Sequence, residues 1–163
     1  MKMTWARSEP YLYVATSRIK CWSKVRNEGN GLRPRNPLYK GVTDVVYSIK
    51  EDGSKGWPIM PRPFPMGNWK ITGFKEHPDP TEDNGYLYPI FIMTNAVNPV
   101  PEWELDGDGL YLRPTGKIVL DYYNGLHFSS SDWTQGCLRI DTEDNVRWLW
   151  SVLSIGDDFV VTA

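Results

Sequence analysis

One segment near the end of the chain has the periodicity of a helix. Four apolar residues recur there at the i, i+3, i+4, i+7 spacing of one helix face: Val146, Leu149, Trp150 and Leu153. Asp141 or Thr142 precedes them as an N-cap, and acidic residues then suit the positive end of the helix dipole. The sequence therefore predicts one main helix, over about residues 142–154, which Gly156 would end.

The rest of the chain consists of short runs rich in aromatic and β-branched residues, which are typical of strands. The first two, residues 11–16 and 19–25, are separated by Ser17 and Arg18 and predict a hairpin. Further strands are expected at 68–74, 88–94, 110–113, 117–123 and 159–162. The expected fold is therefore mostly β.

Glycines and prolines predict where regular structure is interrupted. Residues 27–37 should form a loop, and so should the polar, proline-containing residues 95–109. Residues 56–65 contain four prolines, at positions 58, 61, 63 and 65. Neither a helix nor a central strand passes through such a segment, so we expect an extended stretch on the surface.

Length and composition favour a single domain over residues 1–163, because nothing in the sequence marks a linker. Hydrophobic residues make up 40% of the chain, including eight Trp and nine Tyr, so a core can form. The formal charge is −2 and there is no long basic run. Nucleic acid is therefore not an expected partner.

The first ten residues contain no apolar run long enough for a secretory signal or a membrane helix. We therefore expect a protein that is made in the cytoplasm without a signal peptide and has no membrane segment. It would either act there or leave by another route.

The two cysteines lie in different surroundings. Cys21 belongs to a strand-like run, whereas Cys137 follows Gly136 in a polar loop. Two cysteines in a chain without a leader are more often free thiols than a disulfide. We expect both to be reduced, and only Cys137 to have a chemical role.

His127 lies ten residues before Cys137, where a predicted strand ends. A nearby imidazole can take the proton of a thiol, forming the thiolate–imidazolium pair of thiol acyl-transfer enzymes. Gly136 would let a substrate carbonyl approach backbone N–H groups that stabilise an oxyanion. Ser129 and Trp133, in the intervening loop, are candidate pocket residues.

Two polar residues flank this segment. Arg139 would share a strand face with Cys137, where its charge would favour the thiolate or hold a substrate carboxylate. The alternative is a surface ion pair with Asp132 or Asp141. Thr134 either orients the histidine or bonds within its own loop.

Spacing alone also fits a structural interpretation, in which Cys137 is a small buried hydrophobe and His127 is simply packed. The chain would then be a non-catalytic cell-wall or carbohydrate-binding module. Five tryptophans could stack on sugars, although most are expected in the core: Trp22, Trp57, Trp69, Trp103 and Trp133. A different thiol enzyme, such as an amidase, is a third hypothesis. No metal site is expected from two histidines and no cysteine cluster.

The segment Thr134-Gln135-Gly136-Cys137-Leu138-Arg139 resembles the signature of the L,D-transpeptidase (YkuD-type) catalytic domain. In that signature, Ser/Thr-His-Gly-Cys is followed by a hydrophobic residue and Arg or Asn. Residues 63–71 are similar to the Pro-x-Gly-x-Tyr-x-Ile strand entry of the family. The resemblance covers roughly residues 57 to 163 and implies a β-sandwich or barrel domain with one main helix.

The resemblance also implies an activity. Cys137 would attack a carbonyl of a peptidoglycan stem peptide, expel a terminal D-amino acid and become acylated, with His127 as the base. Water would complete L,D-carboxypeptidase activity, and an amine would complete exchange or cross-linking. Four residues would form the oxyanion and substrate-binding site: Thr134, Gln135, Gly136 and Arg139. The reaction requires no metal and no organic cofactor.

Two features depart from the cell-wall-building members of this family. Gln135 stands where they have a second histidine, so an amide or backbone donors would take any oxyanion role. The separation of His127 from Cys137 is also shorter. Both features resemble the short leaderless branch found among type VI secretion effectors, which attack the peptidoglycan of competing bacteria. This resemblance implies a toxin acting in the periplasm of a target cell, with an immunity protein as a candidate partner.

Overall fold

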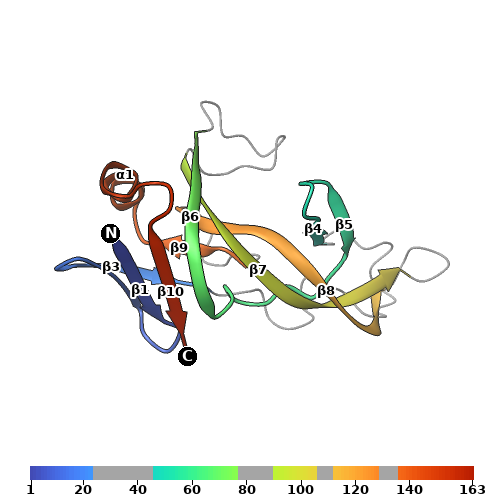
Figure 1. Cartoon of the computed structure of the whole chain (residues 1–163). Coiled ribbons are helices and arrows are strands. Elements are labelled where there is room, and N and C mark those ends of the chain that lie inside the picture. Colours follow the sequence, from blue (N-terminus) through green and yellow to red (C-terminus); the bar gives the residue numbers. More distant parts are fainter. Residues whose placement is uncertain (24–45, 77–89, 106–111, 129–135) are drawn as a thin grey trace.

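The computed structural model describes residues 1–23, 46–76, 90–105, 112–128 and 136–163 (Figure 1). Ten strands and one helix lie in these ranges: β1 (Lys2–Ala6), β2 (Tyr11–Val14), β3 (Ser17–Trp22), β4 (Tyr47–Ile49), β5 (Lys55–Pro58), β6 (Gly67–Glu76), β7 (Ile90–Leu105), β8 (Leu112–His127), β9 (Leu138–Ile140), α1 (Glu143–Val152) and β10 (Asp158–Thr162). The prediction of a mostly β fold with one main helix is confirmed. The expected loop at 27–37 lies outside the described residues.

Eight of the strands close into a barrel in the order β1-β10-β6-β7-β8-β9-β3-β2, while β4 and β5 form a separate two-stranded sheet. Most neighbours are antiparallel, but β1 pairs with β10 and β8 with β9 in parallel. The side chains inside the barrel form one apolar core, to which every barrel strand contributes. The strand alternation read from the sequence thus places one face of each strand in this core.

The hairpin of β2 and β3 is confirmed, but its turn is not where the sequence placed it. Val14 pairs with Ser17, so the turn consists of Ala15 and Thr16, with Ala15 at a φ of 53°. The register is set by burial, because this pairing puts buried Leu12 directly opposite buried Ile19.

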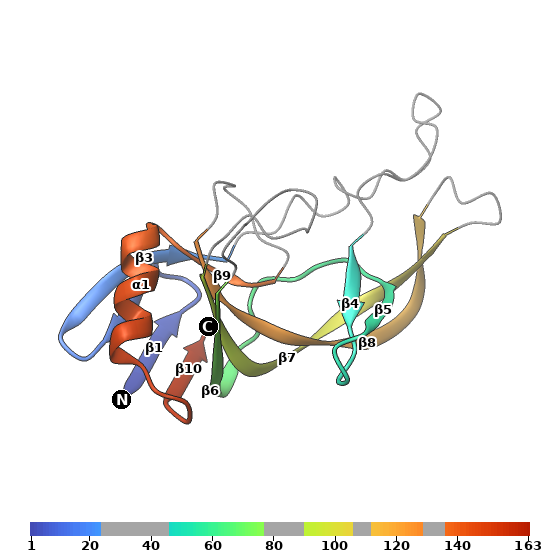
Figure 2. The ribbon, with the colours of Figure 1, turned by 90° about the horizontal axis from the view of Figure 1, so that it is seen from above.

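A long hairpin replaces the loop expected at 95–109. β7 continues as a strand to Leu105, and β8 joins the two short strands predicted at 110–113 and 117–123. A loop was expected here because of the prolines at 99 and 101. They lie beyond Thr94, where β7 has lost β6 as a partner, and an edge strand tolerates proline. This outer half of the hairpin leaves the barrel beside β4 and β5 (Figures 1 and 2).

Residues 56–65 are extended, as expected, but they are not a surface segment. Phe64 is fully buried and its ring lies 5.3 Å from that of Phe159, between centroids. Ile59 and Met60 are buried as well. Proline prevents regular pairing but does not oppose burial, and these apolar side chains gain free energy by leaving water.

Helix α1 forms as its sequence predicts. The side chain of Thr142 accepts a hydrogen bond from the Asn145 amide at 3.1 Å, which makes it the N-cap. Val146 and Leu149 are fully buried in the core. Within the described residues, no helix has the length and apolar character needed to cross a membrane.

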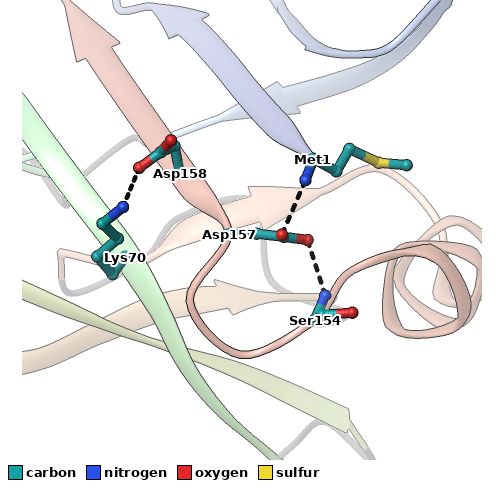
Figure 3. A network of polar contacts seen from close by, with 5 residues as sticks. All are labelled: Met1, Lys70, Ser154, Asp157 and Asp158. Atoms are coloured by element: carbon teal, nitrogen blue, oxygen red, sulfur yellow. Dashed lines mark hydrogen bonds and ion pairs between the residues drawn. The ribbon is translucent and has the colours of Figure 1, made fainter.

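Polar contacts fasten the segment after α1 to two neighbouring strands (Figure 3). The Asp157 carboxylate accepts hydrogen bonds from the Met1 amino group and the Ser154 amide, both at 2.8 Å. Asp158 forms an ion pair with Lys70 of β6. The start of β10 is thereby held between β1 and β6.

Two isoleucines on adjacent strands test the position of the core. Ile92 on β7 has no exposed surface, whereas Ile118 on β8 is 64% exposed. Ile92→Ala should lower the free energy of unfolding by about 2–5 kcal/mol, because it leaves a cavity. Ile118→Ala should lower it by less than about 1 kcal/mol. Urea unfolding measures both, and equal losses would contradict the assigned core.

Candidate active site

Cys137 lies immediately before β9, at the end of the barrel where β7 and β8 leave it. It is partly exposed, and the Gly125 amide donates a hydrogen bond to its sulfur. Its carbonyl oxygen accepts a hydrogen bond from Ser23 Oγ at 3.0 Å. Ser23 Oγ in turn accepts one from the Phe64 amide at 2.8 Å. The cysteine is therefore fixed by three segments that are far apart in the sequence.

Gly136 has a structural reason to be glycine. Its φ is +121°, a conformation that side chains disfavour, and it is buried. A Cβ here would lie 2.9 Å from Asn124 Oδ1 and 3.4 Å from the Arg62 carbonyl oxygen. The chain can thus pass closely over the neighbouring strands only at a residue without a side chain.

His127 ends β8 and is only 7% exposed. The parallel register pairs His127 with Arg139 and Leu126 with Leu138, so the amide that bonds to Cys137 lies two residues before the histidine. Two residues of strand correspond to a rise of about 7 Å. Cys137 and His127 therefore lie two positions apart along the seam between β8 and β9.

Arg139 is buried between aromatic rings. Its guanidinium carbon lies 4.4 Å from the ring centroid of Trp22 and 5.3 Å from that of Phe128. The alternative that placed Arg139 on the surface is wrong, because Arg139 is only 7% exposed, while Asp132 lies outside the described residues. Cation–π contact is favourable for a guanidinium that has lost part of its water.

Four of the predicted site residues lie in the segment 129–135, outside the described residues: Ser129, Trp133, Thr134 and Gln135. Their roles remain predictions. The described part of the predicted site comprises Gly136, Cys137, Arg139 and His127, which the structure gathers around the start of β9.

Asp121 was not predicted as a site residue. This aspartate lies on β8, is only 7% exposed, and accepts a hydrogen bond from the Ile49 amide at 2.7 Å. Its carboxylate also acts electrostatically on Cys137. The only signal was an acidic residue within a β-branched run, which looked like an ordinary solvent-facing strand position.

Two buried amide side chains that were not predicted as site residues, Asn124 and Asn98, lie next to Gly136. Asn124 Nδ2 donates to the carbonyl oxygens of Asp121 at 2.9 Å and Ala96 at 3.3 Å. Asn98 Nδ2 donates to the carbonyl oxygen of Pro63 at 3.0 Å. Asn124 thereby satisfies backbone groups at the bulges of β7 and β8, and Asn98 satisfies one in the extended segment before β6.

Burial decides the charge states at the site. It raises the pKa of the Cys137 thiol to about 12, with a further rise from Asp121 against the lowering effect of the Gly125 amide. It lowers the pKa of His127 to about 4, helped by the Arg139 charge and opposed by a hydrogen bond with the Phe128 backbone. Both shifts disfavour the charged thiolate and imidazolium and favour a neutral thiol and a neutral imidazole in the free protein.

This result changes how the thiol can be tested. Slow alkylation at neutral pH would have favoured a binding module, because such a module has no reason to ionise its cysteine. A catalytic thiol whose pKa is raised also reacts slowly until a substrate arrives. Alkylation of the free protein therefore no longer separates the two hypotheses, and product formation does.

A hollow of about 690 Å³ opens at the same end of the barrel as Cys137. Its lining includes Trp5, Arg7, Glu9, Trp22 and Ser23. Trp22 and Ser23 also belong to the surroundings of Cys137, through the ring under Arg139 and the hydrogen bond to the cysteine carbonyl. Two residues that line the hollow thus also contact the segment that holds Cys137.

The tryptophans singled out in the sequence are less buried than expected. Trp57 is 45% exposed, while Trp22, Trp69 and Trp103 are partly buried. Trp133 lies outside the described residues. Both cysteines are free thiols, as expected. Within the described ranges, no three His, Cys, Asp or Glu side chains gather as a metal site would require.

The buried Asp121 carboxylate makes a prediction about stability and pH. Burial raises its pKa from 3.8 to about 6, so the folded state holds a buried charge at pH 7 at a cost of up to about 3 kcal/mol. Asp121→Asn keeps an oxygen for the Ile49 amide and removes the charge. The variant should unfold at a higher temperature than the wild type at pH 7.

This advantage of the variant should fade as the pH falls from about 6 to about 4. Over that interval the folded wild type binds the proton before the unfolded chain does, which removes its penalty. Thermal unfolding at pH 7 and pH 4 measures the difference, with the exposed Asp158→Asn as the control. A less stable Asp121→Asn at both pH values would contradict the assignment of a buried charge.

Comparison with known families agrees with this geometry. The model of the L,D-transpeptidase catalytic domain, YkuD, matches residues 1–161. No curated protein matches the chain, and no solved structure does. The family match includes the N-terminal strands, which the resemblance of residues 57 to 163 leaves out. It covers almost the entire chain, together with a mostly β barrel that has one helix. The chain therefore belongs to the L,D-transpeptidase catalytic domain family.

Proposed function

We propose that Cys137 of this family member attacks a carbonyl of peptidoglycan stem peptides and becomes acylated. His127 would act as the base. One observation carries the proposal. The parallel seam of β8 and β9 holds the sulfur against the Gly125 amide, two residues before the histidine. Few other arrangements bring a fixed thiol and a buried imidazole to the same barrel end.

The neutral resting state favours a particular order of events. The thiol proton moves to His127 as the sulfur attacks the substrate carbonyl, so the charged pair exists only during the reaction. The imidazolium then protonates the departing D-amino acid, and a thioester to Cys137 remains. The Gly136–Cys137 backbone is the proposed source of oxyanion donors, with Gln135 as a further donor.

In this proposal, Arg139 affects how readily His127 accepts a proton. Its charge, fixed between two rings, disfavours the protonated form of His127 in the free enzyme. A stem peptide brings carboxylates, and one of these near Arg139 would offset its charge and make the histidine a better base.

The biological setting is a further part of the proposal. Gln135 in place of a histidine and the short separation of His127 from Cys137 resemble the type VI secretion effectors. We infer a toxin that is exported to the periplasm of a target cell, where it acts on peptidoglycan. A producing cell would then need an immunity protein that covers this barrel end.

The two cysteines provide a matched test of the nucleophile. Purified protein, incubated with disaccharide tetrapeptides, should release the terminal D-alanine, as measured by mass spectrometry. Cys137→Ala should abolish the release and remain folded, whereas Cys21→Ala should retain it, since buried Cys21 belongs to the core. Release by the Cys137 variant, or an internal cut instead of D-alanine loss, would contradict the proposal.

Replacing the base should slow the reaction without abolishing the nucleophile. His127→Gln keeps a polar side chain of similar size and should lower kcat by about 10²–10⁴-fold, because the thiol proton loses its acceptor. Raising the pH should recover part of the rate, since hydroxide then ionises the thiol directly. A variant that is slow at every pH to the same degree would assign His127 a structural role.

One observation favours a second candidate, a non-catalytic wall-binding module. The hollow beside the site is lined by Trp22, which is partly exposed, and aromatic rings stack on sugars. Sedimentation with purified sacculi distinguishes the two. Binding by wild-type protein that releases no D-alanine would favour the module.

A further inference from the structure

The hollow beside the candidate active site is not used by the proposed mechanism. Its volume of about 690 Å³ lies within the range of small-molecule sites. Two residues of its lining contact the segment of the cysteine. Ser23 Oγ donates a hydrogen bond to the Cys137 carbonyl oxygen at 3.0 Å, and the ring centroid of Trp22 lies 4.4 Å from the Arg139 guanidinium carbon. One wall of the hollow is therefore fastened to the backbone of Cys137.

Another part of the lining is the turn between β1 and β2, which carries Arg7 and Glu9. Hydrogen bonds hold the backbone of this turn in place. The Arg7 amide donates to the Thr162 carbonyl oxygen, and the Trp5 indole N–H donates to the Glu9 carbonyl oxygen, both at 2.9 Å. The lining of the hollow thus extends from the segment of Cys137 to two opposite charges on a fixed turn.

The side chains of Arg7 and Glu9 are open to a ligand, because both are exposed. No ion pair joins either of them to another side chain among the described residues. They are also the only charged side chains in the described lining, which is otherwise largely apolar and includes Trp22, Pro63 and Met66. A ligand that complements this lining has an apolar stem and ends in both a carboxylate and an ammonium group.

We propose that the hollow binds the side chain of the third residue of the donor stem and selects diaminopimelate at that position. This inference rests on the proposed function and adds the class of stem that the enzyme prefers. The side chain of diaminopimelate is an apolar chain that ends in one carboxylate and one ammonium group. Arg7 binds the carboxylate, and Glu9 binds the ammonium group.

The order of residues in the substrate supports the third position. The carbonyl that Cys137 attacks, when the terminal D-alanine leaves, belongs to the third residue, so this residue must lie at the cysteine. Its side chain then starts beside the wall that Ser23 and Trp22 form. The same hollow has Arg7 and Glu9 in its lining.

The carboxylate of the ligand provides the selectivity. A lysine at the third position has the same ammonium group but no side-chain carboxylate, so Arg7 gains no partner from it. A guanidinium that makes two parallel hydrogen bonds to a carboxylate contributes more than an ordinary exposed ion pair. The preference for diaminopimelate therefore measures the contact with Arg7.

The test compares two stems of the same shape. Disaccharide tetrapeptides contain either diaminopimelate or diaminopimelate whose side-chain carboxylate is amidated, and mass spectrometry measures the release of D-alanine from each. We expect the wild type to prefer the carboxylate form by about fivefold to tenfold in kcat/KM. Arg7→Gln should bring this ratio close to one by slowing only the carboxylate form, whereas Arg7→Lys should retain part of the preference. Arg18→Gln is the control, because Arg18 is exposed, lies outside the hollow and has its guanidinium over the Tyr11 ring.

Two results would overturn the inference and leave the proposed function intact. One is a wild type that releases D-alanine equally well from both stems. The other is an Arg7→Gln variant that keeps the wild-type ratio, whether or not both rates fall. A wild type that releases no D-alanine from either stem would instead reject the proposed function, and this inference with it.

Discussion

The site depends on a short stretch of parallel pairing between β8 and β9. Only two residue pairs are involved, Leu126 with Leu138 and His127 with Arg139, yet β9 closes the barrel between β8 and β3. This pairing brings the Gly125 amide to the sulfur of Cys137. Gly125 must lack a side chain, because a Cβ would lie 2.3 Å from the Ile92 carbonyl oxygen. Closing the barrel and placing the proposed nucleophile are thus one structural event.

Burial is the second constraint, and it sets the chemistry. Burial raises the pKa of the Cys137 thiol and lowers the pKa of His127, so it favours the neutral form of both groups. Asp121 is the exception, since its raised pKa still leaves it mostly ionised at pH 7. With these pKa shifts the thiol would react slowly until a substrate brings its own charged groups. The slow reaction would protect the thiol from modification before a substrate binds.

The sequence predicted the features that follow from local pattern. Helix α1 was predicted by its apolar spacing, and most strands by their runs of aromatic and β-branched residues. The family resemblance came from the residues around Gly136, and the catalytic pairing of Cys137 with His127 stays a prediction from the chemistry of a thiol and an imidazole. These inferences needed no knowledge of the tertiary structure.

The features that sequence could not predict depend on which strands become neighbours. The outer half of β7 is a strand despite Pro99 and Pro101, because it no longer pairs with β6 beyond Thr94 and takes its regular pairing from β8. Asp121 looked like a solvent-facing residue until the β4–β5 hairpin covered it. Arg139 looked like a surface charge until Trp22 and Phe128 enclosed it. Each is a tertiary effect that a one-dimensional pattern does not contain.

The central claim is that Cys137 carries the acyl group, and the intermediate itself can be measured. Wild-type protein mixed briefly with the tetrapeptide, quenched in acid and digested should contain a peptide around Cys137 that is heavier by the donor stem without its D-alanine. The added mass should disappear after treatment with hydroxylamine, which cleaves thioesters. Release of D-alanine with no added mass at Cys137, or with the mass on another residue, would contradict the account.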